Sequence, residues 1–153
     1  MAYWLMKSEP TVFGIDHLAG APRQTTSWDG VRNYQVRNML RDDVRQGDQA
    51  FFYHSGCAVP GIAGIVNIVS AAHPDATAFD PSSEYYDAKS TFAEPIWYSV
   101  DVELAQRFAT LVTLPQLRGE KALKSMKLLQ RGNRLSITPV RAAEWVHILA
   151  LVP

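Results

Sequence analysis

The sequence predicts one α+β domain over residues 1–153, built on a strongly bent mixed sheet or partial barrel of about five strands with short flanking helices. Two observations favour this class. Short apolar or alternating stretches typical of strands recur along the chain, separated by brief helical patterns. These strands and helices do not alternate as regular βαβ units. A chain of 153 residues is long enough to bury one hydrophobic core.

The first strand is expected at residues 2–6, which are apolar on both faces and therefore suit a central position. Pro10 cannot donate to a strand ladder and ends this element. Thr11 is a suitable N-cap for a short helix that closes at Gly20. Residues 22–27 form a polar connection.

A helix is expected over residues 32–43, followed by strands over 49–54 and 61–72. The helix carries one apolar stripe at Val36, Leu40 and Val44. In the second strand, two glycines indicate a bulge or a close backbone approach, and these are Gly61 and Gly64.

Residues 73–89 form a long excursion of the kind that is often functional. Clean alternation then predicts a strand over 97–104. Pro115 begins a short helix, and residues 134–137 form the last strand. Thr138 is expected to cap a final helix whose core-facing residues are Val140, Ala143, Val146, Ile148 and Leu149.

Composition excludes several classes of protein and site. Because the formal net charge is zero, no global field attracts nucleic acid. One cysteine, Cys57, excludes a disulfide framework, and the four histidines lack zinc-site spacing, so we expect neither a metal nor a cofactor. Charged residues interrupt the apolar start at Lys7 and Glu9, which argues against a signal peptide. No apolar run is long enough to span a membrane, so we expect a cytoplasmic protein without membrane partners.

The stretch Trp28–Asn38 carries the strongest functional pattern. It combines a tryptophan, a glycine, amides, guanidiniums and a phenol just before a helix. Such groups suit a flat, polar, anionic ligand, which can stack on the indole and bond to backbone N–H groups at the helix start. A surface loop beside a solvated helix face explains the same residues. Trp97, on the polar face of its strand, is a second candidate for stacking on a base.

Catalytic patterns are weaker. His54 and Ser55 are neighbours in an expected strand and should point to opposite faces, and no phosphate-binding glycine loop or nucleophile elbow occurs. An enzyme acting on modified nucleotides or RNA through His54, Ser55 or Asp87 is one alternative, and a sensor of a free nucleobase is another.

Six motifs occur in the order seen in EVE domains: residues 7–10, 28–35, 51–55, 85–90, Trp97 and 134–136. The whole chain resembles a stand-alone bacterial EVE protein and is similar to the thymocyte nuclear protein family. The resemblance implies a PUA-like fold, related to YTH domains, and a non-catalytic reader of a modified base. The implied partner is DNA carrying modified cytosine or adenine, or modified RNA.

The resemblance also implies roles for individual residues. Trp28 and Trp97 would form stacking walls, and Asn33 would read the base edge. The rest of the implied base site comprises Lys7 and Ser8 at the rim, backbone groups of Gly30 and Val31, and a floor of Tyr53, His54 and Ser55. Phosphate would meet the cations Arg32, Lys124, Lys127 and Arg131.

Overall fold

The computed structural model describes residues 1–153, and its centre is a six-stranded sheet in the order β2-β7-β4-β3-β1-β8. The strands of this sheet are β1 (Tyr3–Ser8), β2 (Thr25–Ser27), β3 (Gln49–His54), β4 (Gly61–Ile68), β7 (Asp101–Thr113) and β8 (Ile137–Val140). A separate pair joins β5 (His73–Pro74) to β6 (Tyr98–Ser99). The predicted α+β class with a strongly bent mixed sheet is confirmed, with six strands in place of about five.

Short helices connect these strands. The α-helices are α1 (Pro10–Phe13), α2 (Ile15–Ala19), α3 (Tyr34–Asn38), α4 (Leu114–Arg118) and α5 (Ala142–Leu149). The short 3-10 helices are η1 (Pro22–Gln24), η3 (Ala76–Phe79), η4 (Lys121–Leu123) and η5 (Lys127–Leu129), and η2 (Met39–Asp43) is one turn of π-helix. No helix is long and apolar enough to cross a membrane.

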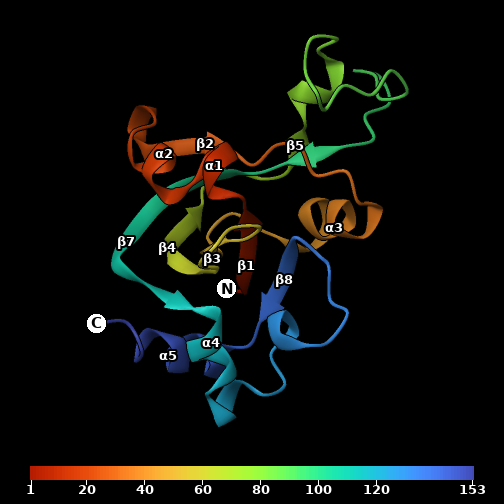
Figure 1. Ribbon diagram of the computed structural model, residues 1–153. Helices are drawn as coiled ribbons and strands as arrows, with labels where there is room; N and C mark the ends of the chain where they lie inside the picture. The colour runs from red at the N-terminus through yellow and green to blue at the C-terminus, as the bar shows by residue number, and fades with distance from the viewer.

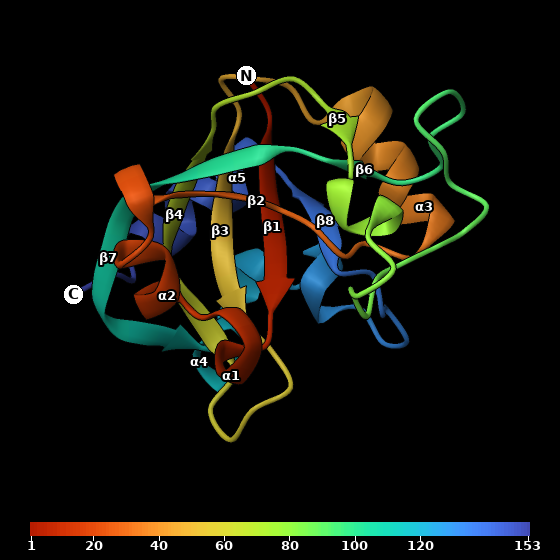
Figure 2. The ribbon, with the colours of Figure 1, turned by 90° about the horizontal axis from the view of Figure 1, so that it is seen from above.

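The sheet is mixed because β1 pairs in parallel with β3 and antiparallel with β8. A parallel pair needs a long crossover connection, and the segment between β1 and β3 supplies it with α1, α2, β2 and α3. In Figure 1 this crossover places α1 and α2 above the central strands and brings β2 to the edge of the sheet beside β7, while α4 and α5 lie below. The view from above shows α1 beside the end of β1 (Figure 2).

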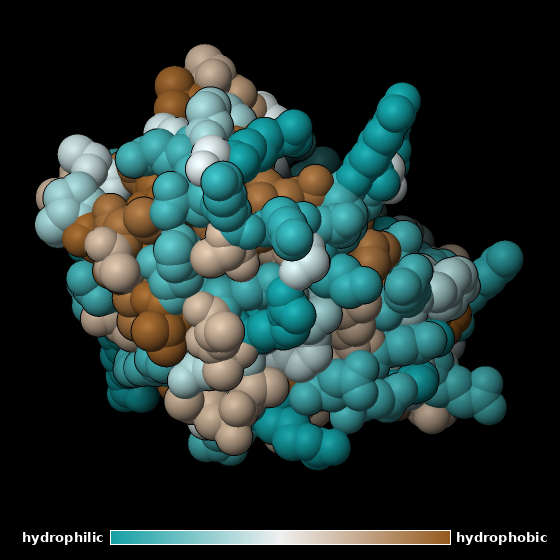
Figure 3. All heavy atoms as spheres, turned by 90° about the horizontal axis from the view of Figure 1, so that it is seen from below, coloured by the Kyte–Doolittle hydropathy of each residue, from teal (hydrophilic) through white to brown (hydrophobic).

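Both faces of the sheet are buried, as the apolar run of β1 predicted. The buried side chains form two clusters, one on each face of the sheet. Trp4, Met6 and Phe52 belong to the cluster on the side of α2, which we call the upper core. Leu5 belongs with Trp145 to the cluster on the side of α5, which we call the lower core. Seen from below, the molecular surface is mostly hydrophilic, with apolar areas scattered over it (Figure 3).

The glycines of β4 allow the sheet to curl. A Cβ at Gly61 would lie 2.6 Å from the Val112 carbonyl oxygen, and one at Gly64 would collide with the Gln106 carbonyl oxygen. The β4–β7 register shifts at two places, one of them between Ile62 and Gly64. The predicted close approach and bulge are therefore confirmed.

Several element boundaries differ from the sequence prediction. The helix expected from a Thr11 cap to Gly20 is two helices, because α1 begins at Pro10 and Gly14 separates it from α2. The last strand covers residues 137–140 instead of 134–137.

Thr138 lies inside β8, because residues 137–140 pair with β1, and α5 begins only after Arg141. As a result Trp145 faces the core, whereas Val146 is 65% exposed. β7 continues to Thr113, well beyond the predicted end of its strand, and residues 25–27 form an additional strand rather than a loop.

Candidate functional site

Two adjoining cavities of about 260 and 410 Å³ open beside Trp28, and we call them together the Trp28 cavity. They have five lining residues in common: Ser8, Val12, Trp28, Asp29 and Tyr85. The end of β1, helix α1, the loop before α3 and the 73–89 excursion supply these walls. Volumes of this size match small-ligand pockets, which typically measure about 300–1,000 Å³.

Trp28 is held by the upper core and borders the cavity. Its backbone N–H donates to the Val100 carbonyl, and its ring meets Phe52 edge-on at a centroid distance of 5.5 Å. Only 8% of the residue is exposed. Trp28 therefore offers a preorganised aromatic surface rather than a mobile one.

Gly30 allows Tyr85 to form the facing part of the wall. Its φ of +83° is a conformation that favours glycine, and a Cβ there would lie 2.8 Å from Tyr85 Cζ. The Gly30 N–H donates to Asp75 Oδ2 at 2.9 Å, which fixes the turn against the excursion. A side chain at position 30 would push Tyr85 away from the Trp28 cavity.

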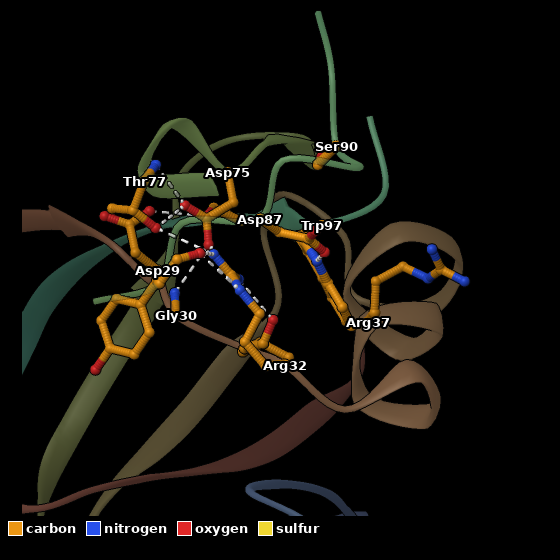
Figure 4. Close-up of polar contacts among 12 residues, drawn as sticks. Asp29, Gly30, Arg32, Arg37, Asp75, Thr77, Asp87, Ser90 and Trp97 are labelled. Atoms are coloured by element: carbon orange, nitrogen blue, oxygen red, sulfur yellow. Dashed lines mark hydrogen bonds and ion pairs between the residues drawn. The ribbon is translucent and has the colours of Figure 1, made fainter. Parts of the chain in front are cut away.

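Arg32 binds the excursion to the loop before α3 (Figure 4). Its guanidinium makes an ion pair with Asp75 at 2.9 Å and also donates to the carbonyl oxygens of Val31 and Tyr85 and to Thr77 Oγ1. All five N–H donors of the guanidinium are thereby engaged. The structure thus places Arg32 in a structural network, with no donor left for the phosphate predicted from the sequence.

Asp75 is the buried centre of that network, with a side-chain exposure of 0%. Burial raises its pKa, but hydrogen bonds from Thr77, Gly30 and Arg32 outweigh burial and lower the pKa below its ordinary value. The carboxylate is therefore charged and saturated with donors. It orients both the Gly30 turn and the excursion that carries Tyr85.

The polar lining of the Trp28 cavity is mainly acidic. Three carboxylates line it, at Glu9, Asp29 and Glu84, against two cations, of which Lys7 alone has its donors unengaged. Desolvation raises the pKa of Asp29, opposed by the hydrogen bond that Ser99 donates to it. Desolvation likewise lowers the pKa of Lys7. Such a lining suits a neutral ligand with hydrogen-bond donors and disfavours the anionic ligand that the Trp28–Asn38 pattern predicted.

Trp97, the second predicted stacking wall, does not line the Trp28 cavity. Its indole N–H donates to Asp87 Oδ2 at 2.8 Å. Tyr34 packs on it at a centroid distance of 4.8 Å, and the Arg32 guanidinium carbon lies 5.2 Å from the ring centroid. With both ring contacts and N–H engaged and 5% of the residue exposed, Trp97 supports the excursion.

Asn33 is exposed, caps α3 through its Oδ1, which accepts from the Val36 N–H at 3.0 Å, and does not line the Trp28 cavity.

The three residues expected as the floor also lie outside the cavity lining. Tyr53 faces the lower core because it alternates with Phe52, which faces the upper core. His54 Nε2 accepts from the Ile15 N–H at 3.1 Å, and burial lowers the pKa of its imidazole, which keeps it neutral. Ser55 pairs through its backbone with Ser8.

The predicted rim and backbone groups do come together. Lys7, Ser8, Gly30 and Val31 all line the Trp28 cavity beside Trp28 itself.

The predicted phosphate-binding cations lie elsewhere. Lys127 and Arg131 line a different cavity, and Lys124 is exposed outside both.

Comparison with known proteins identifies the family. A model of the EVE domain matches residues 2–151. The chain belongs to the EVE family. Human thymocyte nuclear protein 1 is 42% identical over 167 residues, which cover 98% of this chain and 73% of that protein.

Solved structures similar to this chain share its fold over nearly the whole length. A Pseudomonas putida protein is 49% identical with a TM-score of 0.92, covering 98% of this chain and 99% of that one. Human THYN1, solved in complex with 5-methylcytosine containing DNA, is 41% identical with a TM-score of 0.92, covering 99% of this chain and 97% of that one.

Several cavity residues of this EVE domain were not among the predicted site residues. Tyr85 belongs to a motif that indicated the family, but its position against Gly30 depends on a contact between segments 55 residues apart. Asp29 lies between two predicted residues, Trp28 and Gly30, and lines both parts of the cavity. Val12 and Phe13 lie in the short helix expected after Thr11, and both border the cavity.

Proposed function

We propose that this EVE protein is a non-catalytic reader that holds one modified nucleobase, foremost a modified cytosine in DNA, in the Trp28 cavity. The observation that carries the proposal is the composition of this cavity. It joins a rigid aromatic surface, a second aromatic ring and several carboxylates beside a polar rim.

The chemistry of the lining suits cytosine or adenine, whose exocyclic amino groups are donors. Carboxylates accept hydrogen bonds from the cytosine amino group, and Asp29 lies next to Trp28 in the lining. Stacking on an aromatic side chain is worth about 1–3 kcal/mol per base. This gain offsets the few kcal/mol needed to extract a base from a duplex.

Helix α1 provides a contact for an added methyl group. Val12 borders both parts of the Trp28 cavity and is 60% exposed, and Phe13 borders one part. Apolar side chains read the 5-methyl group of thymine in this way. Human THYN1 was solved in complex with 5-methylcytosine containing DNA, which supports the same class of ligand for the present protein.

The test compares two oligonucleotides that differ only in one 5-methyl group on a central cytosine, titrated against tryptophan fluorescence. Wild-type protein should bind the methylated strand more tightly, and Val12→Ser should reduce the preference by about fourfold, since a buried methyl group is worth about 0.8 kcal/mol. Because Val12 is exposed, the variant should keep its melting temperature. Equal binding of both oligonucleotides by wild type would contradict the proposal for cytosine.

Mass spectrometry of the same incubations separates a reader from an enzyme. A reader returns the oligonucleotide unchanged, whereas a product mass would assign the cavity to catalysis. Binding of the free nucleobase as tightly as the oligonucleotide would instead indicate a metabolite sensor.

A further inference from the structure

The excursion over residues 73–89 starts at His73, whose side chain returns to the central sheet. His73 Nε2 lies 2.9 Å from Asp101 Oδ1 at the start of β7 and 3.4 Å from Ser27 Oγ at the end of β2. Ser27 Oγ also donates to Asp101 Oδ1, at 3.0 Å. Side chains from β5, β2 and β7 therefore meet at one carboxylate oxygen, and we call His73, Ser27 and Asp101 the His73 cluster.

Both ring nitrogens of His73 face hydrogen-bond acceptors. Nδ1 lies 3.2 Å from the Pro74 carbonyl oxygen, and Nε2 faces the Asp101 carboxylate. The Ser27 hydroxyl gives its hydrogen to Asp101 and so offers Nε2 no donor. A neutral imidazole carries one N–H and can serve only one of these acceptors, whereas the imidazolium carries two and serves both. The geometry therefore favours the charged form of His73.

The surroundings of His73 favour the same form. Desolvation lowers the pKa of His73, but its hydrogen bonds to Asp101 and Pro74, together with the charges of Asp101 and Asp29, outweigh desolvation and raise the pKa above 6.5. Ser27 on β2 and Ser99 on β6 are the uncharged neighbours of the ring and its strand. Asp101 forms no ion pair with any residue other than His73. Loss of the His73 proton thus removes the cation from Asp101 and breaks one of the two bonds of the ring.

The His73 cluster adjoins the Trp28 cavity, because Ser27 itself lines this cavity. A second connection passes through the β5–β6 pair, in which His73 is the partner of Ser99. Ser99 Oγ donates to Asp29 Oδ1 at 2.8 Å, and Asp29 lines both parts of the cavity. His73 is thus joined by contacts to two lining residues, one of which is the proposed acceptor for the base.

We propose that His73 is a positioning residue for the Trp28 cavity: its imidazolium holds the start of the excursion against Asp101 and Ser27, so that the cavity binds its ligand most tightly while His73 is charged. For its effect on affinity this inference rests on the proposed base reader. The charge on His73 and its effect on the cavity wall can be measured without a ligand.

The pH range of the effect follows from the sign of the pKa shift. Because the pKa of His73 is raised, the contribution of the charged pair is fully present below pH 6.5 and is lost as pH rises through the raised value. The side chains of His73 and Asp101 are 37% and 39% exposed, so the pair is partly screened by solvent. We expect a loss of affinity of about two- to fivefold, which is typical of such a pair.

The first measurement uses the free protein. Proton–nitrogen NMR of the imidazole rings should show both nitrogens of His73 protonated at pH 6.5, and Asp101→Asn should lower the midpoint of this titration. The signal is assigned as the one absent from His73→Gln. The backbone amide signals of Ser27 and Asp29 should shift with the same midpoint in wild type and should not do so in His73→Gln.

The second measurement follows the affinity for an oligonucleotide with one 5-methylcytosine from pH 6 to pH 9. Wild type should lose affinity over this range, and His73→Gln should bind more weakly at pH 6 and show no such loss. His73→Arg keeps a charge that does not titrate in this range, so it should restore tight binding and keep it at pH 9. A merely structural role for the ring would not be rescued in this way.

His147→Gln is the matched control. His147 is also partly exposed and pairs with a carboxylate, Glu120, at 2.8 Å, but neither residue lines the Trp28 cavity. This variant should keep the wild-type dependence of affinity on pH. An equal change in the His147→Gln and His73→Gln profiles would overturn the role of His73.

The outcomes separate the two proposals. Constant affinity of wild type from pH 6 to pH 9, or the same decline in His73→Gln, overturns the positioning role and leaves the base reader intact. A His73 ring that is neutral at pH 6.5, or amide signals of Ser27 and Asp29 that ignore its titration, overturns the inference whether or not an oligonucleotide binds. Absence of binding at every pH removes the base reader, while the amide signals still decide the effect of His73 on the cavity wall.

Discussion

Trp28 and Trp97 look equivalent in the sequence, since both stand in polar surroundings, but the structure gives them different roles. Trp28 rests edge-on against Phe52 and borders a cavity. Trp97 contacts both Tyr34 and Arg32, and its N–H donates to Asp87. An aromatic residue is available to a ligand only if its other contacts leave one surface open. Trp28 meets this condition next to the cavity, whereas the described contacts of Trp97 stabilise the excursion.

The largest expected effect comes from Asp75, which links the two regions. It accepts from Gly30 on the Trp28 side and pairs with Arg32, which packs on Trp97. Asp75→Ala leaves a partly buried guanidinium unpaired and should lower the free energy of unfolding by about 3–5 kcal/mol, measured by urea denaturation. Asp80→Ala removes an exposed carboxylate of the same excursion whose side chain is bonded only to Ser82, so it should lower the free energy of unfolding far less. Equal losses would show that Asp75 does not link the regions.

The next effect separates the two tryptophans directly. Trp28→Leu and Trp97→Leu both remove a buried ring and should both lower the melting temperature. Only Trp28→Leu should also weaken binding of a modified oligonucleotide, by about 5- to 150-fold, which corresponds to the stacking energy of one base. A loss of binding confined to Trp97→Leu would move the stacking surface to Trp97 and reverse the comparison.

The smallest effects are on pH dependence, because the carboxyls beside the two tryptophans have pKa values shifted in opposite directions. Desolvation raises the pKa of Asp29 above 3.8, and the Trp97 N–H lowers the pKa of Asp87 below 3.8. Titration by carboxyl ¹³C NMR should show both midpoints. The Asp29 contribution to stability is present below pH 3.8 and is lost as pH rises through its raised pKa. The Asp87 contribution is present above pH 3.8 and is lost as pH falls through its lowered pKa.

The affinity for a modified oligonucleotide should depend on the protonation of Asp29 and not on that of Asp87. As pH falls through the raised pKa of Asp29, its carboxylate is protonated and accepts less well from a base amino group, so affinity should decline. Asp29→Asn should remove this pH dependence, while Asp87→Asn should retain it. An unchanged profile for Asp29→Asn would exclude Asp29 as the acceptor.

Local sequence patterns predicted the parts of the fold that depend on neighbouring residues. The apolar run of β1, the stripe at Val36 and Leu40, and the tight glycines of β4 each reflect short-range periodicity or backbone sterics, and each was confirmed. The boundary at Thr138 failed because pairing with β1, more than 130 residues away, overrides the local signal for a helix cap.

The candidate site was predictable only in outline. The loop beginning at Trp28 reaches a cavity, but Arg32 pairs with Asp75, which lies 43 residues away, and no local pattern identifies that partner. Asn33 is different, since an asparagine before an apolar-periodic helix is a recognisable N-cap signal. The ligand-reading interpretation gave that signal too little weight.

The place of β1 between β3 and β8 has a consequence for synthesis. Residues 137–140 complete the pairing of residues 3–6, so one edge of β1 stays open until residues 137–140 are translated. At about 5–20 residues per second, this interval lasts roughly 6 to 26 s. An apolar strand with an open edge is a template for pairing with other chains. We therefore expect ribosome-bound chains that stop before residue 137 to aggregate or recruit chaperones, and release of the full chain to end this vulnerability.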